Sequence, residues 1–154
     1  METTNQTAWE TLTPEEKRRI LHDKYMENEF FEIFSFGDSP EMADELLKLV
    51  LEGKKTATVS VYPEDEAKPQ IGDLSLVLDG RGEPACVIKT VYLQTVPFRD
   101  LTWEMVRLEG EDDSFEEWVT GNRRYWTRDA ERRGYVFDDS TPVCFERFEV
   151  TEVF

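Results

Sequence analysis

The sequence predicts an α+β fold in which a small, curled, mixed β-barrel is flanked by helices. Helical periodicity in the N-terminal part, alternating β-branched segments after it, and a return to helices and then a strand support this class. The length of 154 residues, with 39% hydrophobic residues, is sufficient for a single core. We therefore expect one domain over residues 1–154, with residues 1–36 as an N-terminal helical extension and residues 37–154 as its core.

Two helices are expected before the first strand. A capping-box pattern begins a helix over residues 13–28, and an aromatic cluster follows at residues 30–36. Ser39 is a suitable N-cap for the second helix, whose apolar face ends at Gly53.

Beyond Gly53 the periodicity changes from helical to alternating. Residues 56–62 are rich in β-branched side chains and predict a strand. Residues 74–78 and 84–93 predict a hairpin with a glycine-rich turn, and residues 142–154 have strand character again.

Two further helices are expected between the hairpin and the last strand. The first is short and runs from Thr102 to Leu108. The second begins with a capping box formed by Ser114 and Glu117, and Trp118 lies on its apolar face. The helices should lie outside the barrel and across one opening, which leaves a cleft where helix meets strand.

The charge limits the partners that this protein can bind. Thirty-four acidic and eighteen basic residues give a formal net charge of −16, which repels polyanions and argues against duplex DNA as a partner. A nucleoside-like small molecule or a short single-stranded RNA remains open, because net charge does not determine the field inside a cleft.

The cysteines and the histidine limit the chemistry. Cys86 and Cys144 lie in apolar, strand-like segments without CxxC spacing, and His22 is the only histidine. This composition predicts no metal site and no cofactor, and it gives poor support to a triad that needs histidine. With no signal peptide or transmembrane run in the sequence, we expect a reduced cytoplasmic protein without a membrane partner. Its oligomeric state stays open.

The segment from Gly53 to Thr58 joins the second helix to the first strand and carries the main functional signal. One interpretation of this segment is a helix C-terminus. Gly53 suits a left-handed conformation, and Lys54 and Lys55 face the negative end of the helix dipole. The alternative is chemical: a desolvated lysine of lowered pKa can remove the proton of the Thr58 hydroxyl. Residues three apart on a straight strand point to opposite faces, so this chemistry requires a bend in the chain before the strand.

The same segment resembles the diagnostic pattern of the ASCH (activating signal cointegrator homology) domain family, within the PUA-like superfold. The pattern Gly-x-Lys-x-x-Thr-x-Arg falls on Gly53, Lys55 and Thr58, and Ser60 stands where the family has arginine. The resemblance spans residues 40–150, and its further matches are Gly72-Asp73, Leu108-Glu109-Gly110-Glu111, Trp118 and Tyr125-Trp126.

This resemblance implies a PUA-like barrel whose cleft binds nucleic acid or a nucleobase. The family includes RNA-cleaving enzymes and amidohydrolases that act on acetylated cytidine. In the latter, a lysine, a threonine and a later glutamate act together, which implies catalytic roles for Lys55, Thr58 and Glu109. Burial would raise the pKa of Glu109 and suit it to protonating a departing amine or activating water.

Further residues are candidates for ligand binding. Tyr62 and Trp126 can stack on a base, and Arg124 lies near Trp126 in the late helix. Gly53 and Lys54 complete the predicted ligand-binding set.

Three functions follow from these residues. The first is a nucleobase- or nucleoside-binding protein that hydrolyses an amide on an acylated nucleoside. The second is a module that binds or cleaves single-stranded RNA, and the third is a non-catalytic ligand-binding domain. The net charge of −16 favours the small ligand.

Overall fold

The computed structural model describes residues 11–13, 15–16, 19, 30–62 and 66–154. The helix expected over residues 13–28 lies mostly outside these residues. Within them, the Thr13 hydroxyl accepts a hydrogen bond of 3.1 Å from the Glu16 backbone N–H, as the capping-box pattern predicts. The single domain and its N-terminal helical extension stay predictions.

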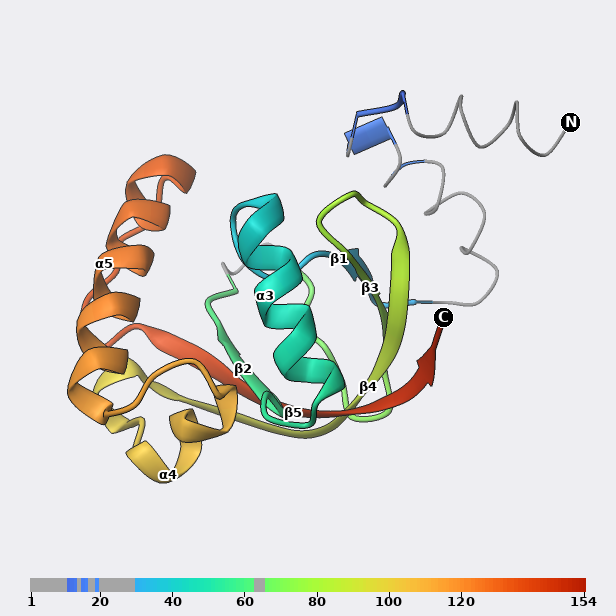
Figure 1. Ribbon diagram of the computed structural model, residues 1–154. Helices are drawn as coiled ribbons and strands as arrows, with labels where there is room; N and C mark the ends of the chain where they lie inside the picture. Colours follow the sequence, from blue (N-terminus) through green and yellow to red (C-terminus); the bar gives the residue numbers. More distant parts are fainter. Residues whose placement is uncertain (1–10, 14, 17–18, 20–29, 63–65) are drawn as a thin grey trace, which may run out of the picture. The chain divides into compact units, whose positions relative to one another are not determined.

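The described residues form one mixed five-stranded sheet with helices (Figure 1). The strands are β1 (Glu32–Phe34), β2 (Ala57–Ser60), β3 (Leu74–Leu78), β4 (Pro84–Pro97) and β5 (Pro142–Val153). The helices are α3 (Pro40–Leu51), α4 (Trp103–Val106) and α5 (Phe115–Arg133), with 3-10 turns η2 (Phe98–Asp100) and η3 (Arg107–Glu109).

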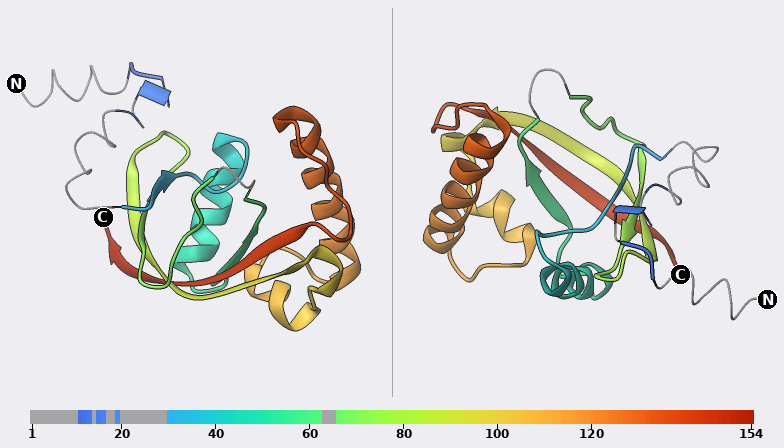
Figure 2. Two further views of the ribbon diagram at one scale, coloured as in Figure 1. Left: turned by 180° about the vertical axis from the view of Figure 1, so that it is seen from behind. Right: turned by 90° about the horizontal axis from the view of Figure 1, so that it is seen from above.

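The strand order in this sheet is β1-β3-β4-β5-β2. Strand β1 runs parallel to β3, whereas the β3–β4 and β2–β5 pairs are antiparallel. The long strands β4 and β5 curve along their length (Figure 2). The predicted α+β class with a curled mixed sheet is therefore confirmed.

Local capping begins the helices where the sequence predicts. The Ser39 hydroxyl accepts a hydrogen bond of 3.1 Å from the Met42 backbone N–H, next to the start of α3. The Ser114 hydroxyl accepts one of 3.2 Å from the Glu117 N–H at the start of α5. Each cap satisfies a backbone donor that has no partner within its helix.

The chain is divided into two compact units. The first contains the described residues up to Leu47 together with Asp73–Lys89 and Val150–Phe154, and the second contains Lys48–Gly72 and Thr90–Glu149. Every predicted site residue lies in the second unit. The core of that unit is a cluster of apolar side chains: Ala57, Val59, Val61, Phe98, Leu101, Val106, Trp118, Trp126, Val143 and Phe145.

In the described part of the chain, no helix combines the length and the apolar character needed to cross a membrane. Cys86 and Cys144 are both free and buried. Burial raises the pKa of each thiol to about 11, so neither is a thiolate nucleophile near neutral pH.

Candidate functional site

The chain bends between α3 and β2, as the candidate chemistry requires. Gly53 has a φ of +77°, and the backbone N–H groups of Lys54 and Lys55 both donate to the Leu49 carbonyl, at 2.9 and 3.1 Å. Strand β2 begins only at Ala57. Lys55 therefore precedes the strand and is free of its alternation.

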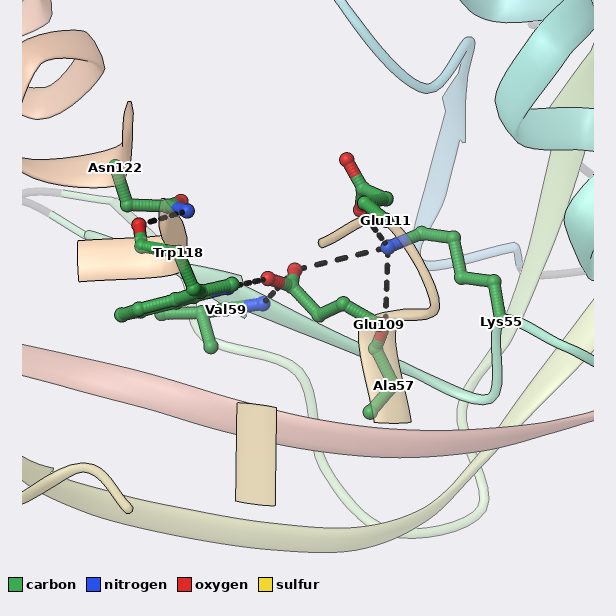
Figure 3. Close-up of polar contacts among 7 residues, drawn as sticks. All are labelled: Lys55, Ala57, Val59, Glu109, Glu111, Trp118 and Asn122. Atoms are coloured by element: carbon green, nitrogen blue, oxygen red, sulfur yellow. Dashed lines mark hydrogen bonds and ion pairs between the residues drawn. The ribbon is translucent and has the colours of Figure 1, made fainter. Parts of the chain in front are cut away.

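The Lys55 side chain turns into the protein instead of lying at the helix end. The residue is 2% exposed, and its Nζ donates to the Ala57 carbonyl at 3.0 Å and to Glu111 Oε2 at 2.7 Å (Figure 3). Glu109 Oε2 lies 3.6 Å from the same nitrogen. The helix-end explanation thus applies to Gly53 but not to Lys55, while Lys54 is exposed and pairs with Glu52 at 3.1 Å.

Glu109 is held by two hydrogen-bond donors besides its ion pair. Its Oε1 accepts a hydrogen bond of 2.5 Å from Trp118 Nε1, and its Oε2 accepts one of 3.2 Å from the Val59 backbone N–H. Burial raises the pKa of Glu109, as predicted, and the charge of Glu111 acts in the same direction. Lys55 and the two donors act against this rise without cancelling it.

These contacts satisfy the outer edge of strand β2, which stands last in the strand order. Among the described residues, no strand neighbours the Ala57 carbonyl and the Val59 N–H on that side, and Lys55 and Glu109 bind them instead. An edge strand whose polar groups are covered in this way is stabilised and shielded from pairing with other chains. We call Lys55, Glu109, Glu111 and Trp118 the edge cluster.

Gly110 lets the loop that carries Glu109 approach the motif. It has a φ of +72°, and a Cβ atom there would lie 2.4 Å from the Lys54 carbonyl oxygen. Gly110→Ala is expected to lower the free energy of unfolding by about 1–3 kcal/mol, because alanine would be strained in this conformation as well as crowded. Urea denaturation measures the loss.

The matched control is Gly121→Ala in α5, where an added Cβ meets no atom within 4 Å. That substitution should be neutral or should stabilise the helix by up to about 1 kcal/mol. Equal effects of the two substitutions would contradict the close packing of Gly110 on Lys54.

The raised pKa of Glu109 predicts how stability changes with pH. The folded protein holds this proton more tightly than the unfolded chain, whose ordinary value is 4.5. The resulting stabilisation is fully present below pH 4.5 and is lost as pH rises through the folded pKa. The urea midpoint is measured as a function of pH. In Glu109→Gln this loss of stability with rising pH should disappear, whereas in Glu116→Gln it should remain. An unchanged slope in Glu109→Gln would contradict the prediction.

Thr58 lies apart from the edge cluster. It is half-buried in β2 and alternates with Ala57 and Val59, whose side chains belong to the core. Its hydroxyl makes no hydrogen bond to any residue that the structure describes, Lys55 included. The structure therefore brings Lys55 and Glu109 together but does not join Thr58 to them.

A groove of about 480 Å³ lies within the second unit. Tyr62, one of the predicted ligand-binding residues, forms part of its wall, and so does Cys144. The remaining lining residues are Val61, Lys68, Thr95, Tyr135, Thr141, Pro142 and Val143. The mixture of aromatic, apolar and hydroxyl side chains is typical of a small-molecule site.

The other predicted ligand-binding residues lie in α5. Arg124 is exposed there, whereas Trp126 is only 8% exposed and packs in the core of the second unit. This burial favours a core role for Trp126 over the predicted stacking role. The exposed ring next to it belongs to Tyr125, which packs edge-on against Trp126 at 4.8 Å between ring centroids.

The acidic residues after Gly110 divide between two roles. Asp113 donates its N–H to Glu117 Oε2 at 3.3 Å, at the start of α5. Glu111 instead binds Lys55, because the turn at Gly110 directs it back toward the motif. No local sequence pattern distinguished Glu111 from its acidic neighbours, because its contact with Lys55 joins residues 56 positions apart.

Comparisons with known proteins agree with this architecture. The family model described as the ASCH domain matches residues 32–152. The chain therefore belongs to the ASCH domain family. No curated protein matched the sequence.

Two solved structures are similar over nearly the whole chain. Protein EF3133 from Enterococcus faecalis V583 is 24% identical, with 90% of each chain covered and a TM-score of 0.74. The ASCH domain from Lactobacillus crispatus JV V101 is 22% identical, with 89% of this chain and 95% of that chain covered and a TM-score of 0.74. These similarities establish the ASCH, PUA-like fold.

Proposed function

We propose that this ASCH domain protein binds a neutral nucleobase or nucleoside beside strand β2 and hydrolyses an acyl amide on that ligand. The observation that carries the proposal is the buried Lys55–Glu109 pair, which binds the backbone on both sides of Thr58 and so anchors the strand that carries this hydroxyl. A threonine hydroxyl can act as the nucleophile in acyl transfer. The cytoplasmic location expected from the sequence is part of this proposal.

The groove supports a small ligand. Its volume of about 480 Å³ is in the ordinary range of small-molecule sites. Tyr62 supplies an aromatic ring in the wall, and such rings stack on bases of any sequence. Ser60, in the position of the family arginine, brings no positive charge to this region.

The charges near the motif also favour a neutral ligand over a phosphate backbone. Two carboxylates, Glu109 and Glu111, face the single ammonium of Lys55. Burial raises the pKa of nearby Asp112, and the negative charges of Glu111, Glu117 and Asp113 raise it further. An RNA phosphate would be repelled by this field, in addition to the net charge of −16.

In the proposed reaction, Thr58 Oγ attacks the acyl carbon and the C–N bond breaks, which releases the amine and leaves an ester on Thr58. Water then hydrolyses the ester, releasing the acid and restoring the hydroxyl. Lys55 and Glu109 support this reaction by holding β2, since the atoms they bind include the backbone on both sides of Thr58. Their substitution would therefore impair activity through the strand as well as through chemistry.

The test is to incubate the protein with N4-acetylcytidine and to follow cytidine and acetate by mass. Wild type and Thr127→Ala, which loses a hydroxyl on α5, should release both products, whereas Thr58→Ala should release neither above background. Product release by Thr58→Ala at the wild-type rate would overturn the proposed reaction. Cleavage of a single-stranded RNA oligonucleotide by wild type but not by Thr58→Ala would favour the nuclease instead.

A further inference from the structure

Glu146 is a buried carboxylate that the proposed reaction leaves unused. It lies in β5 and is 8% exposed. Thr90, in β4, is also buried, and its Oγ1 donates a hydrogen bond of 2.6 Å to Glu146 Oε2. A buried carboxylate costs free energy unless it is bound by polar partners, so Thr90 holds Glu146 in one orientation.

The register of the sheet sets Glu146 opposite Thr58. In the antiparallel β2–β5 pair, Thr58 is the direct partner of Glu146, and Val59 is the partner of Phe145. Directly paired residues point to the same face, with Cβ atoms about 4.5–5.5 Å apart. Since Val59 and Phe145 face the core, Thr58 and Glu146 share the opposite face.

Lys55 is less well placed than Glu146 to accept the proton of the Thr58 hydroxyl. Its ammonium binds the Ala57 carbonyl on the outer edge of β2 and is matched there by Glu111 and Glu109. Glu146 is the direct partner of Thr58 on the neighbouring strand β5, on the other side of β2, and its Oε2 is bound by Thr90 of β4, the strand that flanks β5 on its far side. The residue that faces the candidate nucleophile across the sheet is thus a carboxylate.

The groove reaches the same face of β5. Cys144 lines the groove, and it precedes Glu146 by two residues and pairs with Ser60 in β2. Residues two apart on a strand lie on one face. A ligand in the groove would therefore contact the face that carries Thr58 and Glu146 at Cys144, beside Val61 and Val143 of the core cluster, which line the same groove.

We propose that Glu146, positioned by Thr90, is the proton acceptor for Thr58, an inference that rests on the proposed function. As the bond from Thr58 Oγ to the acyl carbon forms, the hydroxyl proton moves to Glu146 and the carbonyl π electrons move to the oxygen. When the C–N bond breaks, the C=O bond re-forms and the C–N electrons go to nitrogen, which takes the proton from Glu146. The carboxylate then accepts a proton from the water that attacks the ester, and it returns this proton to Thr58 Oγ when the ester C–O bond breaks.

The test compares steady-state kinetics of Glu146→Gln, Thr90→Val and wild type with N4-acetylcytidine. Glu146→Gln should lower kcat by about 100- to 10,000-fold, as loss of a general base does, with KM unchanged. Thr90→Val should lower kcat less, also without changing KM, because the carboxylate remains. Glu149→Gln removes an exposed carboxylate from the same strand and should leave both constants unchanged.

The outcomes separate this inference from the proposed function. Wild-type kcat in Glu146→Gln, together with no turnover in Thr58→Ala, would overturn the role of Glu146 and leave the proposed reaction standing. No turnover by wild type would overturn both. If Glu146→Gln does not fold, Thr90→Val decides: a lower kcat at unchanged KM supports the inference, and an unchanged kcat overturns it.

Discussion

Glu109→Ala is expected to lower the free energy of unfolding by about 3–5 kcal/mol, because it removes a buried carboxylate that faces the Lys55 ammonium and leaves two buried donors without an acceptor. Lys55 would lose one of its two carboxylates, and the donors of Val59 and Trp118 would lose their acceptor. Unsatisfied buried donors add to the cost of the missing ion pair. Urea denaturation followed by tryptophan fluorescence measures this loss.

The matched control is Glu104→Ala. The Glu104 side chain is 86% exposed and lies 3.7 Å from Arg107 at the surface of the second unit. An exposed pair of this kind contributes about 0–1 kcal/mol, so the control should change stability little. Similar losses in the two variants would show that the edge cluster does not anchor β2.

Lys55→Met should be as destabilising as Glu109→Ala, because it leaves the Glu109 carboxylate buried without its cation. Adding Glu109→Gln to Lys55→Met should recover a large part of the loss, since the double variant no longer buries an uncompensated charge. The coupling free energy follows from the free energies of unfolding of Lys55→Met, Glu109→Gln and the double variant. Additive losses would contradict a direct Lys55–Glu109 interaction.

These two effects bear on how loss of activity is interpreted. Substitution of Lys55 or Glu109 alters the support of β2, and Thr58 lies on that strand. Inactivity of a Lys55 or Glu109 variant would therefore not identify a catalytic group by itself. The hydroxyl of Thr58 makes no hydrogen bond to the described residues, so substitution of Thr58 tests a catalytic role more directly.

Most of the fold could be predicted because its signals are local. The hydroxyl caps at Ser39 and Ser114 and the hairpin of β3 and β4 all depend on residues close together in sequence. Strand β1 was missed, and residues 30–36 were interpreted only as an aromatic cluster. A three-residue strand has no readable alternation, and β1 exists because Glu32–Phe34 pair with β3, about forty residues later.

The candidate site could be predicted only in part for the same reason. The approach of Lys55 to Glu109 was implied by the family resemblance, and the bend at Gly53 follows from the lack of a Cβ. The pairing of Thr58 with Glu146 depends on the register between β2 and β5, which no local pattern encodes. Glu146 therefore had no sequence signal that distinguished it from the other acidic residues.

The most direct test is a titration of ¹⁵N-labelled Thr58→Ala protein with N4-acetylcytidine, in which binding is observed without turnover. The amide resonances of residue 58, Tyr62 and Cys144 should shift, and the affinity should hardly change with added salt, because a neutral nucleoside releases no counterions. Shifts confined to α5 around Arg124 would contradict a ligand site beside β2. An affinity that falls steeply with added salt would contradict binding of a neutral nucleoside.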